Sequence, residues 1–186
     1  MPVEQLRAVG ISGSTSARSR SRLLVERTLF HLLQCDADTA MIDLGALPAD
    51  ALLARRTDVQ VDEAIALATR ARILVVGTPV YRASYTGQLK TFFDLFPRNS
   101  LSGLAVGLIV TGHGGGHRLA VDHGLRPLIA SLGGLSAARS VYVTDSQLPE
   151  LTTIPEPIDC ETRELAFELC QLAHAPTHSP PSLVHR

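Results

Sequence analysis

Residues 73–96 read ILVVGTPVYRASYTGQLKTFFDLF. The first five residues form a continuous apolar run, which is typical of a strand covered on both faces. Thr78-Pro79 then leads the chain out of the strand in an extended conformation, because the residue before a proline avoids the helical region. Apolar residues at helical spacing predict a helix over 86–96. Three aromatic residues of this helix are expected in the core or at a subunit interface: Phe92, Phe93 and Phe96.

The rest of the chain repeats this order of strand and helix. Strands are predicted at 6–11, 39–44, 104–111 and 138–143, and helices at 21–33, 61–72, 117–132 and 157–173. The alternation indicates βαβ units and a parallel sheet. Five strands predict a doubly wound α/β fold with helices on both faces of the sheet. Residues 1–174 are expected to form a single domain, and the proline-rich residues 175–186 a mobile tail.

The composition narrows the class of protein. The net charge of −1 indicates no nucleic-acid partner. Three cysteines without a CxxC pair favour a reducing compartment over a disulfide framework. No targeting segment is recognised at the start of the chain, and the longest apolar runs are too short to span a bilayer. We therefore expect a cytoplasmic protein without a membrane segment.

In a doubly wound sheet, ligands bind beyond the carboxyl ends of the strands. The first such loop lies in residues 10–22, GISGSTSARSRSR, and precedes a predicted helix. The N–H groups at a helix N-terminus favour an anion, and serine and arginine side chains add donors for phosphate oxygens. Because neither a P-loop nor a GxGxxG motif is present, we predict a site for a monophosphate. Arg20 is nearest the centre of the serines. The alternative is an ordinary N-cap with a solvated loop.

The loops after the third and fourth strands complete the candidate site. The backbone amides of the rigid loop after the third strand are expected to be free to bond a planar heterocycle, with Tyr81 as an aromatic wall. Residues 111–117, TGHGGGH, follow the fourth strand. Three glycines separate the two histidines, so no helix fixes their geometry and we predict no metal site. The glycines instead allow backbone N–H groups to approach a ligand closely.

Four segments resemble NAD(P)H-dependent FMN reductases of the flavodoxin-like superfamily, especially the reductases that serve sulfonate-using two-component monooxygenases. They are TPVYRASYTGQLKTFFDLFP, GSTSARSRSRLL, TGHGGGHRLAVDHGLRPLIASLGG and VTDSQ, and the resemblance extends over most of residues 5–148. It implies a flavodoxin-like fold and an oxidoreductase that transfers a hydride from NADPH or NADH to FMN. The cofactors carry this chemistry, so no catalytic side chain is expected.

The resemblance also implies which residues bind the cofactor. Phosphate contacts are expected from Ser14, Ser19, Arg20 and Ser21, and contacts to the flavin ring from Pro79, Val80, Tyr81 and Arg82. The fourth-strand loop is expected to complete the site with Thr111, Gly112, Gly114 and Gly115. Amides there would stabilise the negative charge of the reduced flavin.

Partners and alternative functions follow from the same resemblance. It implies a homodimer or homotetramer, a partner monooxygenase that consumes reduced FMN, and a π-bulge at a subunit interface, where this chain has His123. One alternative is a reductase that keeps its FMN and passes electrons to a quinone or azo dye. Another is a flavodoxin-type electron carrier, against which the near-neutral charge argues because carriers dock through acidic faces.

Overall fold

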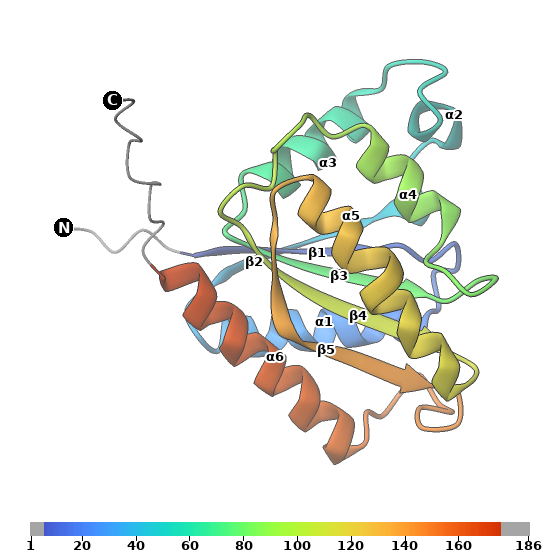
Figure 1. The fold of residues 1–186 in the computed structure, drawn as a ribbon, viewed down its shortest axis with the longest axis vertical. Coiled ribbons are helices and arrows are strands. Elements are labelled where there is room, and N and C mark those ends of the chain that lie inside the picture. The colour runs from blue at the N-terminus through green and yellow to red at the C-terminus, as the bar shows by residue number, and fades with distance from the viewer. Residues whose placement is uncertain (1–5, 176–186) are drawn as a thin grey trace, which may run out of the picture.

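The computed structural model describes residues 6–175, and all five predicted strands join one parallel sheet in the order β2-β1-β3-β4-β5 (Figure 1). The strands are β1 (Arg7–Ser12), β2 (Asp38–Asp43), β3 (Ile73–Pro79), β4 (Ala105–Gly112) and β5 (Leu135–Thr144). The helices are α1 (Arg20–Leu33), α2 (Ala49–Leu52), α3 (Val59–Thr69), α4 (Gly87–Asp94), α5 (Arg126–Ser131) and α6 (Glu156–His174). This is the predicted doubly wound, flavodoxin-like α/β fold.

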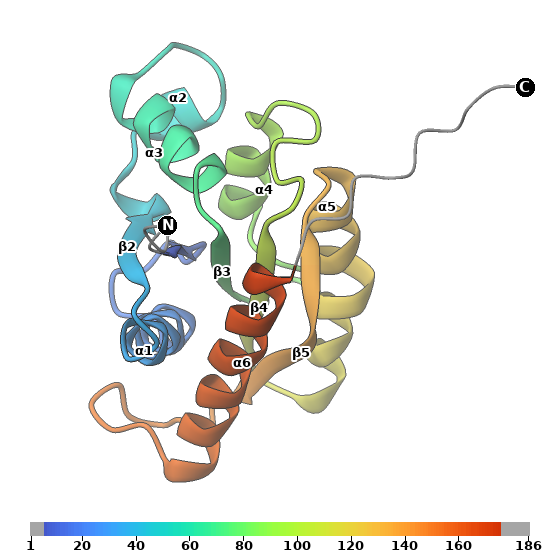
Figure 2. The ribbon, with the colours of Figure 1, turned by 90° about the vertical axis from the view of Figure 1, so that its left-hand side faces the viewer.

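Two hydrophobic cores lie on opposite faces of the sheet. Helices α1 and α6 cover one face, while α3, α4 and α5 cover the other (Figures 1 and 2). In β3, Leu74 and Val76 point into the core beneath α3 and α4, whereas Ile73 and Val75 point toward α1 and α6. Burial on both faces is why the central strands are apolar at every position rather than at every second one.

The aromatic face of α4 belongs to the core of the chain itself. Phe92, Phe93 and Phe96 are 0–7% exposed, and the rings of Phe92 and Phe96 meet edge to face with centroids 5.0 Å apart. The helix lies flat on the sheet, so residues at helical spacing all point inward. The core prediction is confirmed, and the alternative of a subunit interface is wrong for these three side chains.

The helix predicted over 117–132 is confirmed as a continuous helical segment over 115–131, but its winding changes along its length. A 3₁₀ turn, η2 (Gly115–Arg118), comes first; a π-helical turn, η3 (Val121–Leu125), follows; and α5 comes last. Pro127 is the second residue of α5 and follows shortly after the π turn, so the irregular winding lies beside a residue that lacks the N–H of a regular helical turn. The π turn contains His123, as the resemblance implied. Gly124 allows it to pack against Tyr85, because a Cβ there would lie 3.0 Å from the tyrosine ring.

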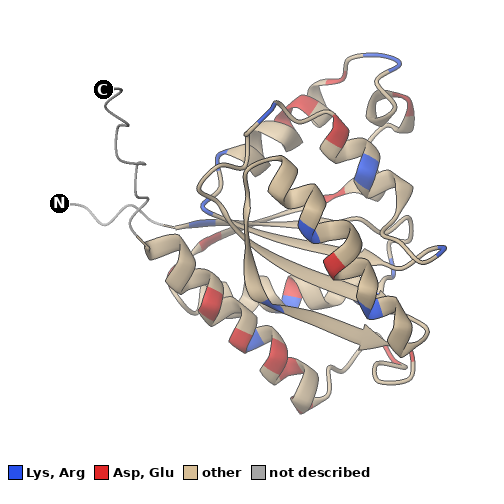
Figure 3. Ribbon diagram, viewed as in Figure 1, with Lys and Arg blue, Asp and Glu red and all other residues tan. Residues whose placement is uncertain are grey.

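The surface carries a mixture of charges. Basic and acidic residues are interspersed over the helices, and acidic residues prevail along α6 (Figure 3). None of the helices within residues 6–175 has the length and apolar character needed to cross a membrane. The predicted tail, residues 175–186, lies outside the described residues except for Ala175, which ends α6.

Candidate functional site

The carboxyl ends of β1, β3, β4 and β5 meet around a cleft of about 270 Å³. It lies where the chain leaves β1 toward one side of the sheet and β3 toward the other, which is the position expected for a ligand in this fold. The cleft is lined by Ser14, Ser16, Arg18, Ser19, Arg20, Pro79, Val80, Tyr81, Thr111, Gly112, His113 and Asp145. Eight of these residues were predicted from the sequence, and four of the predicted ones, Ser21, Arg82, Gly114 and Gly115, lie beside the cleft instead.

The loop between β1 and α1 presents hydroxyl groups around the N-terminus of α1. The side-chain oxygen of Ser14 accepts a hydrogen bond from the amide of Ser16 at 3.1 Å. Ser19 is the N-cap residue of α1, yet its hydroxyl makes no bond to a helix amide and instead lies 2.9 Å from the hydroxyl of the buried Ser21. The first turn of α1 contains no acidic residue. The helix therefore presents its positive end to the cleft without an anion of its own.

The three arginines of this loop point in different directions, as helix geometry predicts. Arg20 donates from Nε to the carbonyl of Leu148 at 2.5 Å and lies 3.3 Å from a carboxylate oxygen of Asp145. Arg22 pairs with Glu26 and with a carboxylate of β2. Arg18 lines the cleft and has no ion pair with any residue from 6 to 175. Arg18 is therefore the guanidinium of this loop that is free for a ligand, and it was not the arginine favoured from the sequence.

The prediction of free amides in the loop after β3 is wrong for Val80 and Tyr81, whereas the amides of Arg82 and Ala83 donate to no atom of residues 6–175. Val80 donates its N–H to the carbonyl of Thr111 at 2.7 Å, which continues the pairing of β3 with β4. Tyr81 donates its N–H to the carbonyl of Ser84 at 2.9 Å, which closes a tight turn. The loop thus offers the cleft the side chains of Val80 and Tyr81, and the phenol ring is 49% exposed.

The turn itself holds two residues in a left-handed conformation. Arg82 has a φ of 52° and Ala83 a φ of 64°. Positive φ at both central residues is the pattern of a type I′ turn, which favours Asn-Gly. Each non-glycine residue costs about 1 kcal/mol or more in this conformation. Arg82 follows Tyr81 in this turn and is not among the residues that line the cleft.

Two threonines connect the Tyr81–Ser84 turn to the loop between β1 and α1. Neither was identified as a site residue from the sequence. Thr86 donates its hydroxyl to the carbonyl of Gly13 at 2.5 Å and accepts the amide of Leu89 at 3.2 Å as the N-cap of α4. Thr78 accepts the amide of Thr86 at 3.2 Å. Both threonines are buried, so the loops after β1 and β3 form one rigid unit. Their position next to a proline and at a helix start was the signal available in the sequence.

Tyr142 of β5 stabilises the glycine loop, residues 113–116, that follows β4. Its hydroxyl donates to the carbonyl of Gly114 at 2.5 Å, and the amide of His117 donates to the same oxygen at 3.0 Å. Burial raises the pKa of the Tyr142 phenol, so it remains a donor at neutral pH. Nothing in the sequence pattern indicated this contact.

The carbonyl of Gly114 is used by Tyr142 and His117, but the amides of the three glycines in this loop are not used by the described part of the fold. The N–H groups of Gly114, Gly115 and Gly116 donate to no atom of residues 6–175. A Cβ on any of the three would meet nothing within 4 Å. The chain's own packing therefore does not require glycine here, whereas close approach of a ligand to the amides would. This observation fits the predicted role in binding a flavin.

Asp145 is a site residue that the sequence did not reveal. It directly follows β5, and one carboxylate oxygen lies 3.5 Å from Nδ1 of the exposed His113 while the other faces Arg20. Its position just beyond a strand's carboxyl end was the only available signal. Asp145 pairs with Arg20 at the edge of the cleft, so Arg20 is less available to a ligand than Arg18 is.

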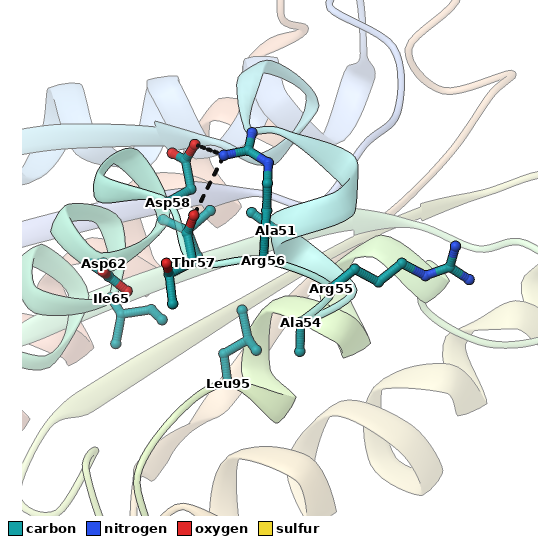
Figure 4. Close-up of a pocket in the computed structure, with 10 residues that line it drawn as sticks. Ala51, Ala54, Arg55, Arg56, Thr57, Asp58, Asp62, Ile65 and Leu95 are labelled. Atoms are coloured by element: carbon teal, nitrogen blue, oxygen red, sulfur yellow. Dashed lines mark hydrogen bonds and ion pairs between the residues drawn. The ribbon is translucent and has the colours of Figure 1, made fainter.

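Two other cavities lack these features. One of about 320 Å³ lies between α2, α3 and the end of α4, away from the strand ends, and its Arg56 is already paired with Asp50 and Asp58 (Figure 4). A larger one of about 780 Å³ runs beside the edge strand β5, where Arg126 and Glu168 bond the strand's own backbone groups. The first cavity meets α3 at a terminus capped by Asp58, and the second meets the loop after β4 only at Gly115 and none of the serines after β1, so the cleft at the strand ends is the candidate site.

Comparisons with known proteins identify the family of the chain. The sequence profile of the NADPH-dependent FMN reductase family matches residues 6–148. An FMN reductase (NADPH) of Pseudomonas putida strain KT2440 is 38% identical over 141 residues, 75% of this chain and 72% of that protein. The NADH-dependent FMN reductase SfnF of Pseudomonas fluorescens strain Pf0-1 is 32% identical and covers 96% of each chain. The apo crystal structure of an NADH:FMN oxidoreductase, EMOB, superimposes with a TM-score of 0.80 at 32% identity, covering 94% of this chain and 92% of that one.

Proposed function

This chain belongs to the family of NADPH-dependent FMN reductases, and from that premise we propose that the cleft at the strand ends is where it reduces FMN. It is an NAD(P)H-dependent oxidoreductase whose ligands are FMN and NADPH or NADH. The observation that supports the location best is the uncapped N-terminus of α1, which opens onto a cleft lined by the loops of four strands.

Each loop has a part in holding the flavin. The hydroxyls of Ser14 and Ser19, with the amides of the first turn of α1 and the free guanidinium of Arg18, would bind the phosphate, while Arg20 stays paired with Asp145 beside them. Pro79, Val80 and Tyr81 would line the ring. Thr111 and Gly112, with the amides from Gly114 onward, would lie beside its pyrimidine edge. When bound, FMN would supply the hydride-accepting chemistry. The residues of the cleft would orient the two reactants and place N–H groups where negative charge develops.

We further propose that FMN arrives and leaves as a substrate and that a partner monooxygenase consumes it. A cleft of about 270 Å³ is at the small end for a pocket that encloses its ligand, so one side of the flavin would remain open to solvent. An open site suits a ligand that must leave after reduction. We also propose a homodimer or homotetramer, a single domain over residues 1–174, and a cytoplasmic location, which the three free cysteines support.

Steady-state oxidation of NADPH and NADH with FMN, FAD and riboflavin tests the assignment. We expect turnover with FMN and a Michaelis constant for riboflavin at least about tenfold higher, because riboflavin lacks the phosphate that the α1 terminus binds. Absence of flavin-dependent turnover with both nucleotides would contradict the function. Equal use of FMN and riboflavin would contradict the phosphate site.

Gel filtration distinguishes FMN that dissociates as a substrate from FMN that stays bound as a cofactor. An FMN substrate should be lost from the protein on the column, and the rate should then depend on added FMN. If FMN remains bound and a quinone raises the rate without added flavin, the protein is a quinone or azo reductase instead.

A further inference from the structure

The turn from Tyr81 to Ser84 is a rigid support for one charged side chain. Two backbone hydrogen bonds close it: the amide of Tyr81 to the carbonyl of Ser84 at 2.9 Å, and the amide of Ser84 to the carbonyl of Tyr81 at 3.1 Å. Its two central residues, Arg82 and Ala83, both have a positive φ. Glycine or asparagine would occupy these positions without strain, yet the chain has an arginine and an alanine there.

The surrounding structure keeps the turn in this conformation. Thr78 and Thr86 are buried and hydrogen-bonded to each other at the base of the loop, and Val80 is bonded to β4. Both ends of the turn are thus fixed to the sheet, and the strained residues cannot relax into extended backbone. Strained residues held in this way are characteristic of ligand-binding loops.

The side chain that the turn presents has no partner of its own. Arg82 is exposed, and its guanidinium makes no ion pair or hydrogen bond with any residue from 6 to 175. Its neighbour Tyr81 lines the flavin cleft. Arg82 therefore lies next to the cleft, on the loop whose side chains are proposed to line the ring rather than on the loop between β1 and α1.

The chemistry of an unpaired guanidinium at this place selects the ligand. A guanidinium binds phosphate oxygens through two parallel hydrogen bonds, and holding it on a rigid turn reduces the entropy lost on binding. A cleft of about 270 Å³ is too small to hold FMN and a dinucleotide together, so most of the nicotinamide nucleotide would lie outside it, beside the loops that line it. This nucleotide carries a pyrophosphate and, in NADPH, a 2′-phosphate.

We propose that Arg82 binds a phosphate of the nicotinamide nucleotide and that the strained turn holds it in position for this purpose. This inference rests on the proposed function. The resemblance had placed Arg82 beside the flavin ring, and here it is assigned to the nicotinamide nucleotide instead. Arg82 thereby contributes to the choice between NADPH and NADH, according to which phosphate it meets.

Substitution of Arg82 by alanine tests the assignment, with Arg55→Ala as the matched control. Arg55 is also exposed and unpaired within the described residues, and it projects from the edge of the cavity between α2 and α4, away from the cleft (Figure 4). For Arg82→Ala we expect the Michaelis constant of at least one nucleotide to rise about tenfold, a typical loss for one charge-assisted pair. The Michaelis constant of FMN should change less than twofold. Arg55→Ala should alter neither.

The two nucleotides distinguish the two phosphates. A rise for NADPH alone identifies the 2′-phosphate as the partner, while an equal rise for NADPH and NADH identifies the pyrophosphate. A change of less than threefold for both nucleotides, or a larger effect on FMN than on either nucleotide, overturns the proposal. Failure of the wild-type protein to oxidise either nucleotide would instead contradict the proposed function, so the two failures are distinguishable.

Ala83→Gly tests the role of the strained turn separately. Relief of the left-handed strain should raise the melting temperature by about 2 to 4 °C for a chain of this size. The more flexible turn should raise the Michaelis constant of the nucleotide about twofold to threefold, an exchange of stability against function. A stabilised variant whose nucleotide constants are unchanged would overturn the role given to the turn.

Discussion

Helices α1 and α6 lie on the same face of the sheet, pack against each other and begin beyond strand ends, but their N-termini differ in charge. The first turn of α1 has no acidic residue and no side-chain cap. The first turn of α6 contains Glu156 and Asp159, and Asp159 is only 6% exposed. One helix therefore presents free donors to the cleft, while the other supplies its own anions.

The hydrogen-bond partners of the Asp159 carboxylate come from α1, so side chains of α1 compensate the charge at the N-terminus of α6. Arg27 donates to both carboxylate oxygens, at 2.5 and 2.9 Å, and Nε2 of His31 lies 2.8 Å from one of them. These hydrogen bonds hold the pKa of Asp159 well below its usual value. The comparison teaches that a helix N-terminus marks a binding site only when the chain leaves its donors unsatisfied.

The largest expected effect comes from a substitution that displaces the N-terminus of α1 and so removes its difference from α6. Gly77 of β3 lies under this terminus, where a Cβ would overlap Cγ2 of Val25 and come within 3.0 Å of the carbonyl oxygen of Ser21. Since backbone and a β-branched side chain cannot yield, we expect Gly77→Ala to lower the free energy of unfolding by about 3 kcal/mol. Urea denaturation measures the loss, and the Michaelis constant of FMN should rise as well.

Gly107→Ala is the matched control beneath α6. A Cβ on Gly107 would meet only the ends of leucine side chains, at 2.8 Å from Leu169 and 3.3 Å from Leu165. These ends can rotate, so we expect a loss of about 1 kcal/mol and no change for FMN. Equal losses in the two variants would show that α1 is not held more tightly than α6.

A carboxylate introduced at the N-terminus of α1 would make this terminus similar to the N-terminus of α6. Ser19→Asp supplies a cap for the free amides and a negative charge where the phosphate is proposed to bind. We expect the Michaelis constant of FMN to rise about 100-fold, equivalent to about 2.7 kcal/mol. Riboflavin has no phosphate to repel and should be used as before.

Ser19→Asn provides the neutral control for this charge. Asparagine has the size of aspartate and also caps a helix, so it should change the constant for FMN by less than about fivefold. If the aspartate variant binds FMN as well as the asparagine variant does, the phosphate lies elsewhere.

Neutralising Asp159 tests the other terminus. Asp159→Asn leaves Arg27 and His31 without their anion, and we expect a loss of about 2 kcal/mol at pH 7, less than for a fully buried pair because Arg27 is partly exposed. The ionised carboxyl is favoured in the folded state, so its contribution is complete above the unfolded pKa of about 4 and is lost as the pH falls below it.

The difference in stability between wild type and Asp159→Asn should therefore shrink between about pH 5 and pH 2. Urea denaturation of both proteins across this range measures it. A difference that stays constant with pH would exclude the carboxylate as its source. FMN kinetics should be unaffected at pH 7, because this terminus faces no ligand.

Tyr142→Phe is expected to have the smallest effect. It removes only the hydroxyl that holds the carbonyl of Gly114, so the glycine amides lose one support. We expect the Michaelis constant of FMN to rise about fivefold, near 1 kcal/mol for one hydrogen bond. Tyr85→Phe is the control, since the Tyr85 hydroxyl donates to no residue from 6 to 175. Equal effects would remove Tyr142 from the site.

Much of the site could be predicted from local sequence. The serines after β1 and the Pro79–Tyr81 segment line the cleft because each directly follows a buried apolar strand, and parallel strands bring their carboxyl ends to one edge. The choice among Arg18, Arg20 and Arg22 could not be made in the same way. Arg20 is held by Asp145 and Leu148, which are more than a hundred residues away in the chain, and no local pattern indicates such a partner.

Asp159 illustrates the same limit at α6. Its position in the first turn is typical of an acidic residue that complements the helix dipole. The packing of α1 against α6 buries it and brings Arg27 and His31 to it. The local pattern therefore indicates the sign of the charge but not the burial or the partners.

The sequence alone determined the order of strands and helices, the two-sided burial of the sheet and the edge where ligands bind, because periodicity and chain order are local properties. Only the tertiary structure decided which donors remain free. The amides of Val80 and Tyr81 are used within the fold, while those at α1 and in the glycine loop are not. Whether a donor is free depends on partners that are distant in sequence, and these meet only when the chain is folded.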